Sequence, residues 1–354
     1  NNGVDENEAL KLYDEITAFS SYAFNKSHAA AYAIVAYKTA YLKCHYPAEY
    51  FAALLTSVLD SSDKIALYTA ECKRMGIRIL PPCVNESYEN FTATKAGIRF
   101  GLLAIKNLGR SLIEKLVSER QSGRYTSMYD FCLRNHSREF NRKALEGLIK
   151  SGASDGLEDN RRQMLYNIEG VLSAVENERR FSGQGQLDLF DEMGSPNTFI
   201  PQHVPEMSQE MRLSLEKEAT GLYLSGHPMD KFTNFVSNAG FATISDIVSE
   251  RFADGHRVTV AGIISGLKVK QLKNNNLLAT AFVEDISASV GITIFSRQYA
   301  EFKHLLSSEE PVIVTGKISE REDRDTEIIC EKIEKMPDSI EIWIAEMKMY
   351  LNLM

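Results

Sequence analysis

Four neighbouring side chains, Asn25, Lys26, Ser27 and His28, place hydrogen-bonding groups and a cation at the start of a predicted helix. The N–H groups of a first helical turn have no partner inside the helix and favour an anion, so this arrangement suits a phosphate. The alternative is that Ser27 only caps a helix over residues 29–45, as serine commonly does. The residues by themselves leave both interpretations open.

A second set of donors is predicted in a basic segment. Residues 97–150 carry 11 Lys and Arg against 5 Asp and Glu, within a chain of net charge -8. Gly101-Leu-Leu-Ala-Ile-Lys-Asn-Leu-Gly109 precedes an amphipathic helix over residues 110–120, which is the layout of a helix-hairpin-helix. Such a turn presents backbone N–H groups to a DNA phosphate and reads no bases.

The predicted contacts to the duplex DNA backbone come from two turns. They are Lys106, Asn107, Gly109, Arg110 and Ser111 in the first, and Lys150, Ser151 and Gly152 after a helix over residues 141–149. The alternative is an ordinary helical hairpin with a solvated basic face.

A third site is a short apolar peptide, Gln186-Leu-Asp-Leu-Phe190, inside a loop over residues 181–210 that is rich in Gly, Pro, Ser and Gln. A long loop in a compact protein is usually functional. Leu187, Leu189 and Phe190, flanked by acidic residues such as Asp188, suit a peptide that docks into a partner's groove. The alternative is a loop whose hydrophobic side chains fold back on their own domain.

The fourth site lies on predicted strands. From Arg257 onward the apolar residues alternate in about five strands, with one helix over residues 298–306 between the third and the fourth, as in an OB-fold. OB-folds often bind single strands through basic grooves and aromatic stacking. Lys268, Lys270, Lys273 and Phe295 are the predicted contacts, and Asn274-Asn-Asn276 is a predicted hairpin turn.

Composition restricts the remaining possibilities. The five cysteines are far apart and have no spacing typical of a zinc or redox site, so we expect free thiols in a reducing compartment and no metal site. No apolar run approaches the ~18 residues of a membrane span, and the polar start is not a signal peptide. We therefore expect a cytoplasmic protein without a membrane partner. Because the chain starts without Met, inside an apparent helix, we also expect it to be part of a longer protein.

These sites require a multidomain α+β protein. The predicted segments are a helical lobe (1–80), a connector with short strands (81–96), a helix-hairpin-helix domain (97–180), the loop (181–210), a linker with short helices (211–256), a five-stranded OB-fold barrel (257–336) and a tail (337–354). The helical lobe is predicted from four packed helices, the last of them capped by Ser62 or Asp63 and ending at Gly76.

The order of these motifs resembles a known family. Phe24-Asn-Lys-Ser-His-Ala-Ala-Ala-Tyr32 and Ala40-Tyr-Leu-Lys-Cys-His-Tyr-Pro-Ala-Glu-Tyr-Phe-Ala-Ala53 look like the fingers region of the alpha subunit of bacterial DNA polymerase III. Thr220-Gly-Leu-Tyr-Leu-Ser-Gly-His-Pro-Met229 resembles that family's linker, and the pentapeptide at residues 186–190 resembles its motif for binding the sliding clamp. The resemblance covers nearly the whole chain.

The resemblance implies a function in chromosomal replication. The fingers would close over an incoming deoxynucleoside triphosphate, with Asn25 beside it, Lys26 facing phosphate, and Ser27 and His28 near the sugar. The tandem hairpins would hold the primer–template duplex, the OB-fold would meet the single-stranded template, and the loop would bind the sliding clamp. Other polymerase holoenzyme subunits are further expected partners.

The same resemblance places the catalytic aspartates, and the Mg²⁺ ions that they hold, in a palm domain upstream of this chain. We therefore expect no catalytic residue and no bound cofactor here, and no activity of the chain alone. Two alternatives remain: a non-enzymatic adaptor that binds DNA and the clamp, and a translesion relative of the same polymerase family.

Overall fold

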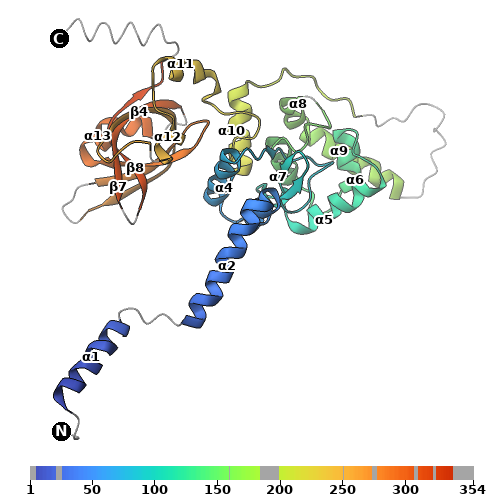
Figure 1. Ribbon diagram of the computed structural model, residues 1–354. Coiled ribbons are helices and arrows are strands. Elements are labelled where there is room, and N and C mark those ends of the chain that lie inside the picture. Colours follow the sequence, from blue (N-terminus) through green and yellow to red (C-terminus); the bar gives the residue numbers. More distant parts are fainter. Residues whose placement is uncertain are drawn as a thin grey trace, which may run out of the picture. The chain divides into compact units, whose positions relative to one another are not determined.

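Figure 1 shows the computed structural model of the chain, which runs from helix α1 to a carboxyl-terminal barrel of five strands, β4 to β8. The residues that it describes are 5–20, 26–158, 160–183, 199–249, 251–272, 277–306, 310–321 and 324–337. The chain divides into two compact units, residues 1–51 and 52–354.

The first unit is helical. It contains α1 (Glu6–Ser20), α2 (Lys26–His45) and the first half of α3 (Pro47–Thr56). Alanine and long unbranched residues favour α2, and Pro47 ends it because the residue before a proline avoids the helical conformation. Proline is in turn well suited to the first position of α3.

The second unit begins with the rest of α3 and with α4 (Ser62–Arg74). The boundary between the two units lies within α3, one of the four helices predicted for residues 1–80. The cap of α4 is Ser61, whose side chain accepts from the N–H of Lys64, and neither Ser62 nor Asp63 serves as predicted. Gly76 follows the helix at φ 73°, as expected for a glycine that ends one.

A small sheet and a helical domain follow. The sheet has the order β1-β3-β2, in which β2 and β3 form the predicted hairpin. The strands are β1 (Ile79–Leu80), β2 (Thr92–Thr94) and β3 (Gly97–Arg99). The helical elements are η1 (Leu102–Ala104), α5 (Arg110–Glu119), η2 (Arg120–Ser122), α6 (Met128–Asn135), α7 (Arg142–Lys150), α8 (Arg161–Tyr166) and α9 (Ile168–Gly183).

The helical domain is organised around a dry core. Leu116 of α5, Phe131 of α6 and Leu148 of α7 have no exposed surface. Phe131 also contacts Tyr125 and Phe140 edge to face. Burying side chains of this size stabilises a fold by about 1.5–3 kcal/mol each. This core fixes the two turns that precede α5 and α8.

A linker of short helices leads to the barrel. It consists of α10 (Gln209–Thr220), η3 (Asp230–Phe232), α11 (Thr233–Asn238) and α12 (Ile244–Val248). Gly221, at φ 81°, ends α10 in the left-handed conformation. Met229 and Phe235 pack on Ala261 and Ile263, so the linker covers one outer face of the barrel.

The barrel is closed in the strand order β4-β5-β6-β8-β7, with β6 and β8 parallel and every other pair antiparallel. Its elements are β4 (Arg257–Gln271), β5 (Leu277–Glu284), β6 (Ser289–Phe295), α13 (Ser296–Leu306), β7 (Pro311–Arg321) and β8 (Arg324–Lys335). Alternate residues point inward and form one apolar core that includes Val260, Val283, Ile294 and Val314. The predicted α+β fold class, with a five-stranded barrel and a helix after its third strand, is confirmed.

Candidate nucleic-acid interface

The turn before α5 leaves several backbone donors without a partner inside the helix. Asn107 has a positive φ of 67°, which reverses the chain, and Gly109 is the N-cap without any side-chain hydrogen bond. The first helical bond runs from the N–H of Ile113 to the carbonyl of Gly109 at 3.1 Å. The N–H groups from Gly109 to Leu112 therefore lack an i−4 acceptor, which makes this turn suited to an anion.

Space and charge at this turn agree with an anionic ligand. A Cβ placed on Gly109 would meet no atom within 4 Å, so the approach to the turn is open. The Arg110 side chain is 66% exposed, and its Nη1 lies 2.5 Å from Glu89 Oε1. Ser111 is exposed beside it.

The two predicted lysines lie elsewhere. The N–H of Lys106 donates to the carbonyl of Ala219 at 2.9 Å, and its Nζ donates to the carbonyl of Glu218 at 2.7 Å. Lys150 Nζ lies 2.8 Å from Glu218 Oε1. Both ammonium groups thus bind the carboxyl-terminal end of α10, where a helix favours cations.

Ser151 and Gly152, predicted as phosphate contacts, are buried. The hydroxyl of Ser151 donates to the carbonyl of Leu148 at 3.0 Å, and its N–H donates to the carbonyl of Gly147. The N–H of Gly152 donates to the carbonyl of Ile149, and φ there is 81°. The structure gives no support for either residue as a DNA contact, because their polar groups are used within the protein.

Gly147 is a residue of this site that the sequence analysis missed. A Cβ at this position would lie 2.8 Å from the carbonyl oxygen of Lys106, so only glycine lets α7 pack this closely on the first turn. The available signal was a glycine in the middle of a predicted helix, which often marks close packing.

The outer face of the barrel strands β4, β5 and β6 carries the second set of candidates. Strand register places Lys270, Leu278 and Phe295 in one row across the three strands. Lys268 lies opposite Thr280 in the next row, and both lysines are exposed. Lys273 lies outside the described residues.

Phe282 is an aromatic residue of this face that the sequence analysis missed as a contact. Its side chain is 51% exposed, as Phe295 is at 48%, and its ring lies against Gly266, which has φ 65°. Phe282 is four residues from Leu278, the partner of Phe295, so the two rings are about 13 Å apart along the strands. The sequence placed Phe282 on a strand, but its register with Phe295 needed the sheet.

The fingers peptide is described only in part. Lys26 begins α2, and Ser27 and His28 lie exposed within its first turn, so Ser27 is inside the helix and not before it. The His28 ring contacts the Tyr32 ring at 4.4 Å. Asn25 lies outside the described residues, as does the whole pentapeptide of Gln186, Leu187, Asp188, Leu189 and Phe190.

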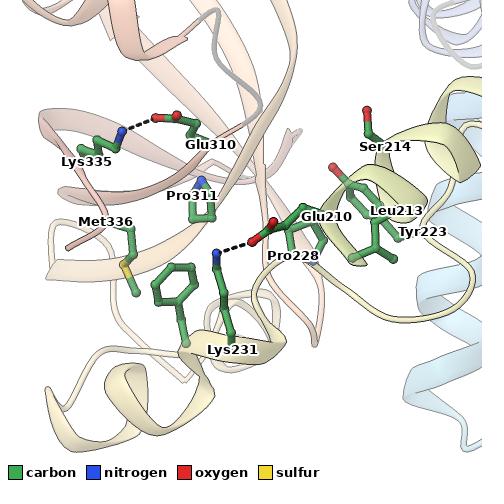
Figure 2. A pocket seen from close by; sticks show the side chains of 11 residues that line it. Glu210, Leu213, Ser214, Tyr223, Pro228, Lys231, Glu310, Pro311, Lys335 and Met336 are labelled. Carbon is green, nitrogen blue, oxygen red and sulfur yellow. Dashed lines mark hydrogen bonds and ion pairs between the residues drawn. The ribbon is translucent and has the colours of Figure 1, made fainter. Parts of the chain in front are cut away.

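A cavity of about 360 Å³ lies between α10, η3 and the barrel (Figure 2). Its wall includes Tyr223, Pro311 and Met336, and two ion pairs lie among its lining residues, Lys231 with Glu210 at 2.9 Å and Lys335 with Glu310 at 2.7 Å. None of the predicted contact residues lines this cavity.

Among the residues that the structure describes, no group of three or more His, Cys, Asp or Glu side chains could hold a metal ion. In the same ranges no helix is both long enough and apolar enough to cross a membrane.

Two family models match the regions that carry these surfaces. The model described as "Helix-hairpin-helix motif" matches residues 76–164, and the one described as "OB-fold nucleic acid binding domain" matches residues 258–336. The first includes both turns, and the second includes the exposed face of β4, β5 and β6.

Curated relatives match almost the whole chain, and each is described as DNA polymerase III subunit alpha. The protein from Saccharopolyspora erythraea is 40% identical over 88% of this chain and 27% of its own length. The Borreliella burgdorferi protein is 34% identical over 94% of this chain and 29% of its own length. The Escherichia coli O157:H7 protein is 33% identical over 90% of this chain and 28% of its own length. The chain therefore spans less than a third of the relatives that it matches.

Solved structures align with only about a quarter of the chain. A mitochondrial single-stranded DNA binding protein from S. cerevisiae, Rim1, covers 25% of this chain at 14% identity and a TM-score of 0.21. A likeness at this score supports no inference.

Proposed function

We propose that this chain holds DNA for a DNA-directed DNA polymerase. It is homologous over 88–94% of its length to DNA polymerase III alpha subunits, and it belongs to that family as a segment. Its two DNA-binding surfaces are the turn at residues 107–109 before α5, here called the first hairpin, which binds duplex product, and the barrel, which binds single-stranded template. The complete polymerase is the enzyme, and this chain binds and positions the DNA.

One observation carries the proposal for duplex DNA. The N–H groups from Gly109 to Leu112 have no i−4 acceptor and no side-chain cap, Gly109, Arg110 and Ser111 are exposed, and the segment matches a helix-hairpin-helix model. Such donors bind phosphate regardless of base sequence. Arg110 adds a positive charge that is two-thirds exposed.

The barrel face supports the proposal for single-stranded template. Phe282 and Phe295 present two exposed rings on neighbouring strands, and Lys268 and Lys270 flank them on β4. Bases of any sequence stack on aromatic rings, and lysines attract the backbone.

The remaining parts of the proposal concern the complete polymerase. Lys26, Ser27 and His28 contact the incoming deoxynucleoside triphosphate, and the peptide from Gln186 to Phe190 binds the sliding clamp. Chemistry requires two Mg²⁺ ions held by carboxylates. The relatives extend well beyond this chain, which leaves room for that site outside it.

Salt dependence of duplex binding tests the central proposal. The full chain should bind a 20-base-pair duplex without sequence preference, and log affinity should fall linearly with log salt. Arg110→Ala should lower that slope by about 0.9, the value for one phosphate contact. Lys95→Ala, which removes another exposed cation, is the matched control and should leave the slope unchanged. Binding that depends on sequence or ignores salt would refute the proposal.

A further inference from the structure

The turn between α7 and α8, here the second hairpin, binds a segment of its own chain. We propose that residues 199–208, here called the strap, occupy the second hairpin in place of a DNA phosphate, so that duplex DNA is held through the first hairpin alone. This inference rests on the duplex binding proposed above and specifies which of the two predicted turns performs it.

A carboxylate of the strap takes the donors at the start of α8. The N–H of Arg161 donates to Glu206 Oε2 at 2.8 Å, and the N–H of Arg162 donates to Glu206 Oε1 at 3.2 Å. The N–H of Met207 donates to the same Oε1 at 2.7 Å. Arg161 and Arg162 open α8, the helix that follows the predicted turn at residues 150–152, so Glu206 takes the N–H groups that lack an acceptor inside that helix.

The charge of Glu206 is maintained by these contacts. Partial burial opposes ionisation, but the hydrogen bonds from the N–H groups of Met207, Arg161 and Arg162 outweigh it, so the pKa of Glu206 is lowered from its usual value. The carboxylate is therefore an anion at neutral pH, as a phosphate would be.

Two asparagines hold the backbone of the strap. Asn160 Nδ2 donates to the carbonyl of Val204 at 2.7 Å. Asn167 is 6% exposed, and its amide donates to the carbonyl of Gln202 at 2.9 Å and accepts from the N–H of Gln202 at 2.8 Å. The strap is thus bound along α8 by several directional contacts and does not depend on Glu206 alone.

The cations of the second hairpin are also used within the protein. Arg161 is 3% exposed and pairs with both oxygens of Asp155 at 2.7 Å and with Glu216 at 2.9 Å. Lys150 pairs with Glu218 at 2.8 Å. At the first hairpin no side chain caps Gly109, and the Arg110 side chain, although its Nη1 lies 2.5 Å from Glu89 Oε1, is 66% exposed, whereas the Lys150 side chain is 24% exposed.

Hydrogen exchange of the full chain, with and without a 20-base-pair duplex, distinguishes the two hairpins. We expect peptides over residues 107–112 to gain protection with DNA, and peptides over residues 160–163 to be protected already and unchanged. In the free protein, Glu206→Ala should speed exchange at residues 161–162 about tenfold or more, because charge-assisted hydrogen bonds are lost. Protection of residues 160–163 by DNA, or no effect of Glu206→Ala, would overturn the inference.

Salt slopes provide an independent measurement. Lys150→Ala should leave the slope of the parent unchanged, whereas Arg110→Ala should lower it by about 0.9. Equal losses from both variants would show that both hairpins hold DNA and would refute the inference. A parent chain without duplex affinity would refute the proposed function itself, and this inference with it, so the two failures are distinguishable.

Discussion

Replacing Gly109 with aspartate should weaken duplex binding while the fold remains intact. Gly109 has φ −88° and ψ 152°, which any residue adopts, and its Cβ position is open to 4 Å. Aspartate is also a favourable N-cap and differs from glycine there by only a few tenths of a kcal/mol. The substitution therefore introduces a negative charge where the phosphate is proposed to bind, with little steric or conformational strain.

The expected magnitude follows from Coulomb's law. Two unit charges about 4 Å apart repel by about 1 kcal/mol in water and by about 4 kcal/mol at the effective dielectric of a protein surface. We expect a loss of about 1–3 kcal/mol, which is roughly 5-fold to 150-fold in affinity. The salt slope should fall by about 0.9 because the added negative charge offsets the neutralisation of about one phosphate by the cations of the site.

Fluorescence anisotropy with a labelled duplex measures the affinity, and a urea titration measures the stability. Gly109→Asn is the matched control, because asparagine has the shape of aspartate and also caps a helix, but carries no charge. Gly109→Asn should lose less affinity for the duplex than Gly109→Asp does, and the two variants should have the same urea midpoint. Parent affinity and slope in Gly109→Asp would refute phosphate binding at this turn.

Four further outcomes are expected. Phe282→Ala or Phe295→Ala should each weaken single-strand binding by about 1–3 kcal/mol in a filter-binding assay. Val269→Ala, on the neighbouring strand β4, is the control. Parent affinity in the phenylalanine variants would exclude base stacking on these rings. Glu216→Ala should lower the free energy of unfolding, measured in urea, by about 3–5 kcal/mol. The reason is that Arg161 and the N–H groups of Leu224 and Ser225 lose a buried partner. Glu218→Ala, at an exposed site, should lower it by at most about 1 kcal/mol. Leu189→Ala with Phe190→Ala should reduce affinity for an immobilised sliding clamp by roughly 30-fold to 1000-fold, and a lowered Tm with unchanged clamp affinity would show a local core instead. The isolated chain should not extend a primer with Mg²⁺ and deoxynucleotides, and measurable incorporation would place the chemistry within it.

The sequence by itself determined the elements and much of their order. Alternation at Val258 and Val260, and at Val290, Ile292 and Ile294, predicted strands whose inward residues form the barrel core. Asn107 and Gly109 before an amphipathic helix predicted the first turn, because a positive φ and an uncapped helix start follow from residue types close together in the chain. Such features depend on local conformation, which neighbouring residues largely decide.

Only the tertiary structure decided which predicted residues are available to a ligand. Lys106 and Lys150 are 112 and 68 residues from Glu218, and no local pattern indicates that the end of α10 binds both. Glu206 reaches Arg161 from 45 residues away, and Gly147 is required only because α7 lies on the carbonyl of Lys106. These pairings form only when distant segments pack. Packing brings charges and backbone groups that are far apart in the sequence within hydrogen-bonding distance.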